Sequence, residues 1–202
     1  MSASKQDLMA RSLAEIRRLK AENEALRQGQ AEPIAIIGLA CRFPGANSAA
    51  QFWEMLRDGR SGVTEVPPER WSLDDYYDED GEVAGKSDSK HGAFLPDVDK
   101  FDAAFFGISP KEARSLDPQQ RLLLEMAWEA MESAGVAHEQ LTAREVGVFV
   151  GMSGLDYAVR LLSPGNEERI DPYFGTGVAM SPAAGRLSYF LKVTGPSVVI
   201  DT

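Results

Sequence analysis

The chain has 202 residues, a net charge of −10, 44% apolar and 26% charged side chains, as a soluble globular protein has. The acidic balance argues against a nucleic-acid partner, because phosphate binding needs clustered lysine and arginine. Apolar runs stay far below the roughly 20 residues that cross a membrane, charges interrupt the N-terminal region, and the single cysteine excludes an internal disulfide. We therefore expect a cytoplasmic protein with no membrane partner.

Residues 5–28 predict one continuous helix, since they contain neither glycine nor proline. The a and d positions of a heptad pattern form a seam that consists of Met9, Ile16, Leu19, Asn23 and Leu26. Isoleucine at a with leucine at d favours a parallel pair, and a single asparagine at a fixes its register. The alternative is an amphipathic helix lying on its own domain. We expect a coiled-coil helix over residues 1–28 and a linker over residues 29–32.

Three segments follow the linker. Pro33 opens an apolar run, residues 34–40, which predicts a buried strand. Residues 48–57 predict a helix that Ser48 caps, with Phe52, Trp53 and Leu56 facing inward. Residues 58–100 are rich in glycine, proline and aspartate, and they predict a long irregular loop that is functional or covers another part of the protein.

The clearest helix signal lies at residues 118–134. Asp117 is the expected N-cap, Pro118 suits the first turn, and Gln120 completes a capping-box pattern. Gly135 is expected to end the helix. The apolar residues cover much of its circumference, so we expect it to be largely buried.

The rest of the chain predicts two strands and a further helix. Residues 145–150 and 197–200 are apolar and rich in β-branched side chains, which suits strands covered on both faces, and residues 182–191 predict a helix that begins with proline. Alternating strands and helices indicate an α/β or layered αβα fold. No turn residues follow residue 200, so we expect the chain to continue in a longer protein.

Motifs for common chemistry are incomplete. Residues 81–87 lack the phosphate-loop spacing, and neighbouring acidic residues do not match a calcium loop. His91 and His138 lack partners at metal-ligand spacing, and residues 151–154 fall one residue short of a nucleophile elbow. Cys41 has no nearby base and is interpreted as a small buried residue. The residues alone therefore indicate no metal site and no catalytic group.

Six stretches together resemble the start of the ketosynthase domain of modular polyketide synthases. In chain order they are EPIAIIGLACRFPG (32–45), FWEMLRDGRSGVTEVPPERW (52–71), GKSDSKHGAFL (85–95), FDAAFFGISPKEARSLDPQQRLLLEMAWEAMESAG (101–135), VGVFVGMS (146–153) and AGRLSYFLKVTGPSVVIDT (184–202). The resemblance implies an α/β, partial thiolase-like fold, with residues 33–202 giving most of the N-terminal half of its layered αβαβα architecture. It also implies a homodimer whose N-terminal coiled-coil helix docks onto an upstream synthase subunit.

The resemblance implies a decarboxylative Claisen condensation between acyl and malonyl-type thioesters on acyl carrier proteins. These partners supply the phosphopantetheine arm, and the domain itself binds no cofactor. The family's nucleophilic cysteine is expected just after Thr202, and its two histidines and lysine lie further on. No catalytic residue is therefore expected in this chain, and the fragment alone is predicted to be inactive.

Some supporting roles are also implied by the resemblance. Phe174, Met180 and Ser181 are candidates for the wall of the acyl pocket at the dimer interface, against the alternative of ordinary core and turn positions. The strand at residues 197–200 resembles the one that pairs with its two-fold mate. Arg186, in an otherwise apolar helix, is expected to be a buried polar anchor.

Two other functions stay open. The chain could be a non-catalytic adaptor that uses its helix and a domain remnant for assembly. It could also belong to a loading-type relative that has glutamine in place of the cysteine and only decarboxylates. The docking helix argues against the second, because loading modules have no upstream subunit to recognise.

Overall fold

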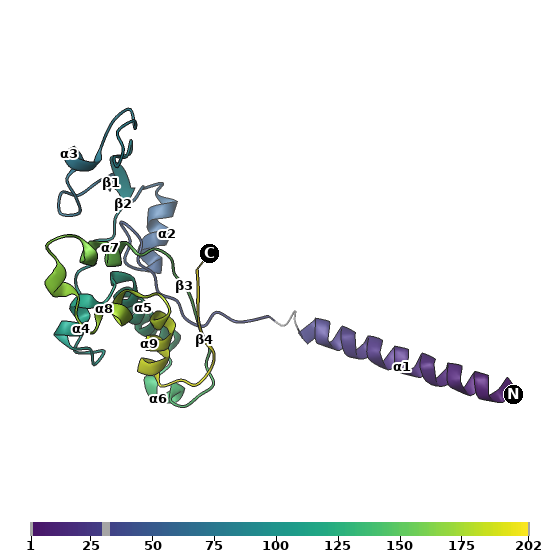
Figure 1. Ribbon diagram of the computed structural model, residues 1–202. Helices are drawn as coiled ribbons and strands as arrows, with labels where there is room; N and C mark the ends of the chain where they lie inside the picture. Colours follow the sequence, from purple (N-terminus) through teal and green to yellow (C-terminus); the bar gives the residue numbers. More distant parts are fainter. Residues whose placement is uncertain (1, 30–32, 202) are drawn as a thin grey trace. The chain divides into compact units, whose positions relative to one another are not determined.

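The computed structural model describes residues 2–29 and 33–201, and the chain divides into two units with a boundary between Ile36 and Ile37. Figure 1 labels the α-helices and strands. In chain order the elements are α1 (Ser2–Gly29), α2 (Ala49–Arg57), β1 (Val63–Glu65), α3 (Leu73–Tyr76), β2 (His91–Ala93), α4 (Pro110–Ser115), α5 (Pro118–Ala134), α6 (His138–Leu141), β3 (Val148–Gly151), α7 (Asp156–Leu162), the 3₁₀ helix η1 (Glu167–Arg169), α8 (Phe174–Val178), α9 (Pro182–Leu191) and β4 (Ser197–Ile200).

One long helix, α1, makes up most of the first unit, as the sequence predicts. Arg18 bridges Glu15 and Glu22 along the helix surface, at 2.8 and 3.3 Å. Exposed pairs at this spacing each stabilise a helix by a few tenths of a kcal/mol. Side chains from residue 9 to residue 26 are all exposed. The helix is confirmed, whereas its pairing with another helix stays a prediction.

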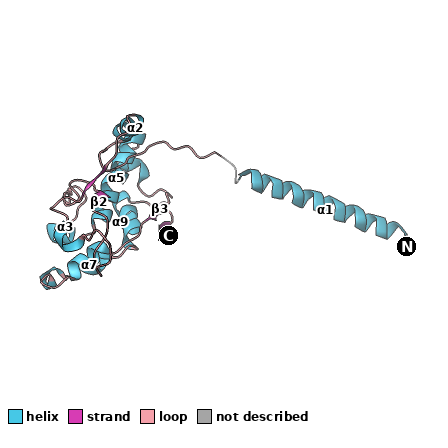
Figure 2. Ribbon diagram, turned by 90° about the horizontal axis from the view of Figure 1, so that it is seen from above, coloured by secondary structure: helices cyan, strands magenta, loops and turns pink. Residues whose placement is uncertain are grey.

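The hydrophobic core of the second unit lies where α5 and α9 pack with β3. Its buried members are Ile108, Leu116, Leu124, Val150, Met152, Ala183, Ala184 and Leu187. Figure 2 shows that helices and loops make up most of this unit. Burial of a leucine-sized side chain contributes roughly 1.5–3 kcal/mol, so these residues fix α9 against the sheet.

The strands β3 and β4 pair in parallel, with Val148 opposite Ser197 and Gly151 opposite Ile200. A parallel pair needs a crossover connection, which here contains α7, η1, α8 and α9. Both predicted strands are confirmed, but the expectation of burial on both faces is wrong. Val150 faces α9 and is only 5% exposed, whereas Phe149 on the opposite face is 67% exposed. The difference arises because the described helices cover only one face of the strand pair.

The predicted strand at residues 34–40 is wrong in this structure. The segment is irregular, Ile34 is 94% exposed, and none of the described strands pairs with it. A strand requires a neighbour for its backbone N–H and C=O groups, and sequence pattern alone does not supply one. Gly38 nevertheless lies directly on α5, since a Cβ there would be 2.3 Å from the Ala130 carbonyl oxygen.

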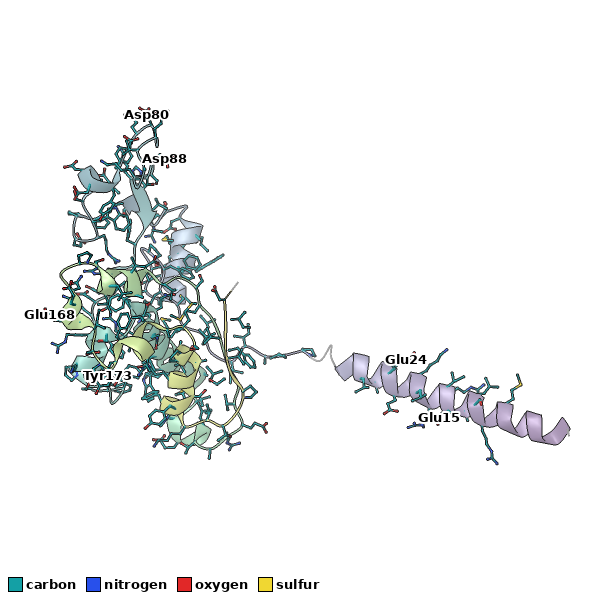
Figure 3. The ribbon with its side chains drawn as sticks, viewed as in Figure 1. Glu15, Glu24, Asp80, Asp88, Glu168 and Tyr173 are labelled. Atoms are coloured by element: carbon teal, nitrogen blue, oxygen red, sulfur yellow. The ribbon has the colours of Figure 1, made fainter. Side chains whose placement is uncertain are left out.

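The next helix is correctly predicted, but its buried face only in part, since Phe52 is half-buried and stacks on Phe43 with ring centroids 4.1 Å apart. Ser48 caps α2 by accepting a hydrogen bond from the Gln51 N–H. Met55 is buried, whereas Trp53 and Leu56 are more than half exposed. After α2, the irregular stretch at residues 58–100 contains the short antiparallel pair β1–β2. The loop between these strands carries Asp80 and Asp88, labelled in Figure 3.

Helix α5 begins and ends where its sequence signals predict. The Asp117 side chain accepts a 2.8 Å hydrogen bond from the Gln119 N–H, and Pro118 occupies the first turn. Gly135 ends the helix with φ 66°, in the left-handed region that favours glycine. Its residues are mostly half-buried, so the helix is less enclosed than predicted.

Candidate functional site

The segment from α8 to the start of α9 is held against α5 by buried polar contacts. The Asp117 N–H donates to the Gly177 carbonyl at 2.9 Å. The Gln120 amide donates to the carbonyls of Gly177 and Ala179, both at 2.9 Å. The capping-box prediction is therefore wrong at Gln120, because the Asp117 N–H donates to Gly177 and the Gln120 amide oxygen accepts from Arg186 instead. The sequence around Gln120 gave no sign that its side chain would bond the segment at residues 177–179.

Arg186 of α9 joins this network from the other side. Its Nη1 lies 2.6 Å from Glu112 Oε1 on α4, and its Nε donates to Gln120 Oε1 at 3.3 Å. Both charged side chains are mostly buried, so each charge is compensated by its partner. The prediction that Arg186 is a polar anchor is confirmed. Glu112, its partner, was not singled out by the sequence.

The three residues proposed for the pocket wall lie on this braced segment. Phe174 and Met180 are half-buried, and Met180 packs against the hydrophobic core. Ser181 is exposed and precedes α9 without making a side-chain cap. The structure thus brings all three onto one short stretch, and their role in an acyl pocket or dimer interface stays a prediction.

The predicted docking seam lies free on α1. Met9, Ile16, Leu19 and Leu26 are each at least half exposed, and Asn23 is exposed among them. Glu15 and Glu24, labelled in Figure 3, mark the charged surface of the same helix. A stripe of this kind is available to a partner helix.

Groups suited to catalysis do not converge among the described residues. Cys41 is free and half-buried, rather than buried as predicted. In the described part of the chain, acidic, histidine and cysteine side chains form no cluster of three that could hold a metal ion. Nor does any described helix have the length and hydropathy to span a membrane.

Two carboxyl groups of the second unit have perturbed pKa values. Burial raises the pKa of Asp117, against the hydrogen bonds from Gln119 that lower it. Burial also raises the pKa of Glu125, which the nearby Arg42 guanidinium partly offsets. Arg42 itself forms a bidentate ion pair with Glu129, so these groups serve the packing of the N-terminal segment on α5.

Sequence reasoning missed a basic cavity of about 690 Å³ on the second unit. Its cationic side chains are Arg70, Lys111, Arg114, Arg121, Arg160 and Arg169. Only the spacing of Lys111 and Arg114, three residues apart, gave a local signal. The other four come from loops and helices far apart in the sequence, and folding alone brings them together.

The class of protein follows from a family comparison. Residues 31–202 match the model of the beta-ketoacyl synthase N-terminal domain. This match covers most of the chain, including the α4–α5–α9 network and both strands of the parallel pair. The chain therefore belongs to the beta-ketoacyl synthase family.

Curated relatives place the chain more narrowly. It is 46% identical over 198 residues to one of the phenolphthiocerol/phthiocerol polyketide synthase subunits of Mycobacterium tuberculosis, covering 96% of this chain and 9% of that protein. It is also 46% identical over 173 residues to the polyketide synthase GfsB of Streptomyces halstedii, covering 85% of this chain and 3% of that protein. The first alignment reaches into α1, which the family model does not cover.

Solved structures agree with this placement. The ketosynthase from module 6 of the bacillaene synthase of Bacillus subtilis superposes with a TM-score of 0.71 at 33% identity, over 83% of this chain and 26% of that one. The oxazolomycin ketosynthase domain OzmH KS7 of Streptomyces albus superposes with a TM-score of 0.69 at 36% identity, over 83% of this chain and 28% of that one. The chain is thus the N-terminal part of a polyketide synthase ketosynthase with a partial thiolase-like fold, spanning about a quarter of those ketosynthase chains.

Proposed function

We propose that the chain supplies the front portion of a ketosynthase that performs decarboxylative Claisen condensation within a longer polyketide synthase. The observation that carries this proposal is the family match over residues 31–202. The chain contributes scaffold: α5 fixes the α8–α9 segment through Gln120, and α9 supports β4. Phe174, Met180 and Ser181 are proposed to line the acyl pocket near the dimer interface.

In the proposed reaction, a cysteine outside these 202 residues takes an acyl group from one acyl carrier protein and releases that carrier's thiol. A malonyl-type group on a second carrier loses CO₂ and leaves an enolate. The enolate carbon attacks the cysteine thioester, so a C–C bond forms and the C–S bond to the cysteine breaks. Two histidines, also outside this chain, stabilise the enolate oxygen, and both substrates arrive on phosphopantetheine arms.

The helix α1 is proposed to dock the protein onto an upstream subunit as a parallel coiled coil. Its exposed a/d stripe supports this, because Ile16 and Leu19 have the heptad preference of two-stranded coils and Asn23 can fix their register. Pairing of two copies of the ketosynthase completes the proposed assembly. We place this assembly in the cytoplasm.

The adaptor function is the second candidate, and the uncovered seam on α1 favours it equally. It differs from the first in one respect: an adaptor performs no condensation in any length of chain. Sequence beyond Thr202 in the parent reading frame separates the two, together with the loading-type alternative, because cysteine and glutamine at the nucleophile position specify different reactions.

The decisive experiment measures β-ketoacyl product from acyl- and malonyl-loaded carrier proteins. The 202-residue chain is expected to give none. A longer protein expressed from the parent reading frame is expected to give product, and replacement of the proposed cysteine by alanine should abolish it. Turnover by the 202-residue chain, or a folded longer protein that releases neither CO₂ nor product, would contradict the proposal. Release of CO₂ without condensation would identify the loading-type reaction instead.

A further inference from the structure

The basic cavity has a charge opposite to that of the whole chain. Its walls come from the loop before α3, from α4, α5, α7 and η1, and from the segments that join them. Six cationic and three acidic side chains line it, which leaves a formal charge of +3 in a chain of net charge −10. Glu168, labelled in Figure 3, marks the rim on the η1 side. Such convergence of like charge costs free energy unless an anion offsets it.

None of the six cations forms a close ion pair within the described chain, although the Arg121 charge acts on the nearby Asp117 carboxylate. Ion pairs within 4.0 Å occur elsewhere among the described residues, and none of them includes a cation of this cavity. Of the acidic lining residues, Asp171 is already engaged, because its Oδ1 accepts hydrogen bonds from Ser115 Oγ and the Tyr173 N–H. The cavity therefore keeps an excess of positive charge that its own acidic residues do not offset.

Arg121 provides an independent sign of a ligand. Its side chain lines the cavity, yet the residue is only 8% exposed. Nη1 donates to the Asp99 carbonyl at 3.2 Å, and the guanidinium lies 5.8 Å from the centroid of the Tyr157 ring. Nε is buried and has no hydrogen-bond partner in the described structure. A buried N–H donor without an acceptor is unfavourable, so native proteins nearly always supply one.

The start of α5 also borders the cavity. Pro118, the first residue of this 17-residue helix, lines it one turn before Arg121. The positive end of the helix dipole is already capped by the Asp117 carboxylate, so the charge of the cavity comes from its side chains. Tyr157 holds the opposite wall in place, because its hydroxyl donates to the Arg114 carbonyl at 2.6 Å.

We propose that this cavity binds a phosphate group. Phosphate presents several acceptor oxygens and up to two negative charges, which match forked guanidinium donors and a formal charge of +3. The volume suits the remainder of a small molecule attached to that phosphate. The group could belong to a free phosphate ester or to the phosphopantetheine arm of a carrier protein. Only the second source rests on the proposed function.

The test is calorimetric titration of the 202-residue chain with 4′-phosphopantetheine, with pantetheine and with inorganic phosphate, at constant ionic strength. We expect 4′-phosphopantetheine and phosphate to bind and pantetheine not to bind. Arg114→Glu and Arg160→Glu change exposed side chains of the rim and should each weaken binding by about tenfold or more, the loss of one charge-assisted contact. Arg144→Glu, an exposed arginine that does not line the cavity, is the matched control and should leave binding unchanged.

Two results would overturn the proposal: no binding of either phosphate compound, or equal weakening by Arg144→Glu and the rim variants. Arg121→Lys tests the buried donor, and should weaken binding while circular dichroism shows a folded chain. If Arg121→Lys does not fold, Arg114→Glu and Arg160→Glu alone test whether the cavity binds phosphate. Competition then separates the two sources: a phosphopantetheinylated carrier protein should displace 4′-phosphopantetheine if the arm is the ligand, and the unmodified carrier should not. Failure of both carriers to compete identifies a free ester and leaves the condensation proposal untouched.

Discussion

At the scale of single residues, Asp117 stabilises the folded state as a helix cap and destabilises it as a buried carboxylate. Its carboxylate caps α5 through the Gln119 N–H at 2.8 Å, while the residue is only 2% exposed and burial raises its pKa above the ordinary 3.8. The folded state therefore holds the proton more tightly than the unfolded state does. This contribution to stability is present below the unfolded pKa and is lost as the pH rises through the folded pKa.

Asp117→Asn should flatten this pH dependence, because asparagine keeps the cap but carries no charge. Unfolding in denaturant at several pH values from about 4 upward measures it. The free energy of unfolding of the wild type should fall more over this range than that of the asparagine variant. Asp117→Ala is the control: it also lacks the titrating carboxyl and it removes the cap, so it should be less stable than Asp117→Asn by about 1 kcal/mol at every pH. Parallel pH profiles of wild type and Asp117→Asn would contradict the interpretation.

Gly177 allows the backbone of α8 to approach α4 closely, because glycine has no side chain. A Cβ at this position would lie 2.2 Å from the Ser115 carbonyl oxygen, whereas one at Gly175 would meet no atom within 4 Å. Gly177→Ala should therefore push α8 away from α4 and lower the free energy of unfolding by roughly 1–3 kcal/mol.

Gly175→Ala is the matched control in the same short helix. It should be neutral or stabilising by up to about 1 kcal/mol, because alanine favours a helix over glycine. Thermal unfolding followed by circular dichroism compares the two. Equal stability of both variants would show that the close approach of α8 to α4 is not required.

At the scale of elements, local signals predicted more than non-local ones. The caps at Ser48 and Asp117 and the stop at Gly135 act within one turn of their helices, and these boundaries are confirmed. The strand expected at residues 34–40 is wrong because pairing depends on another segment. Gln120 and the basic cavity were missed for the same reason, since their partners lie tens of residues away in the sequence.

The exposed seam on α1 should control how this helix associates. A buried asparagine at an a position costs stability but fixes register. Asn23→Leu should therefore strengthen association of a peptide of residues 1–28 and allow more than one register. Sedimentation equilibrium measures the first effect, and disulfide trapping from added terminal cysteines measures the second.

Glu24→Ala changes a residue beside the seam and serves as the control, which should alter association little. If the peptide with Asn23 stays monomeric at high concentration and binds no partner helix, and Asn23→Leu does not change this, α1 is not a coiled-coil segment.

At the scale of the whole molecule, the fold and the family were predictable from the sequence. Which apolar side chains would be buried and which would stay exposed was not. Order and spacing of six stretches indicated a ketosynthase front portion over residues 32–202, and the family match spans residues 31–202. The described structure nevertheless leaves Ile37, Leu39 and Phe149 more than half exposed. Such side chains are buried in complete domains of this composition or face a partner.

Phe149 is therefore expected to promote self-association of the chain. It projects from the open face of the β3–β4 pair, and an uncovered strand face favours association with other chains. The 202-residue chain should self-associate, and Phe149→Ser should weaken that association because it removes a large apolar side chain from the open face. Sedimentation velocity over a range of concentrations measures the change. Tyr189→Ser is the control: Tyr189 is as exposed as any aromatic residue of the described chain, but it lies on α9, and its loss should have little effect. A chain that stays monomeric at all concentrations, or responds equally to both substitutions, would show that the open face of the sheet does not drive assembly.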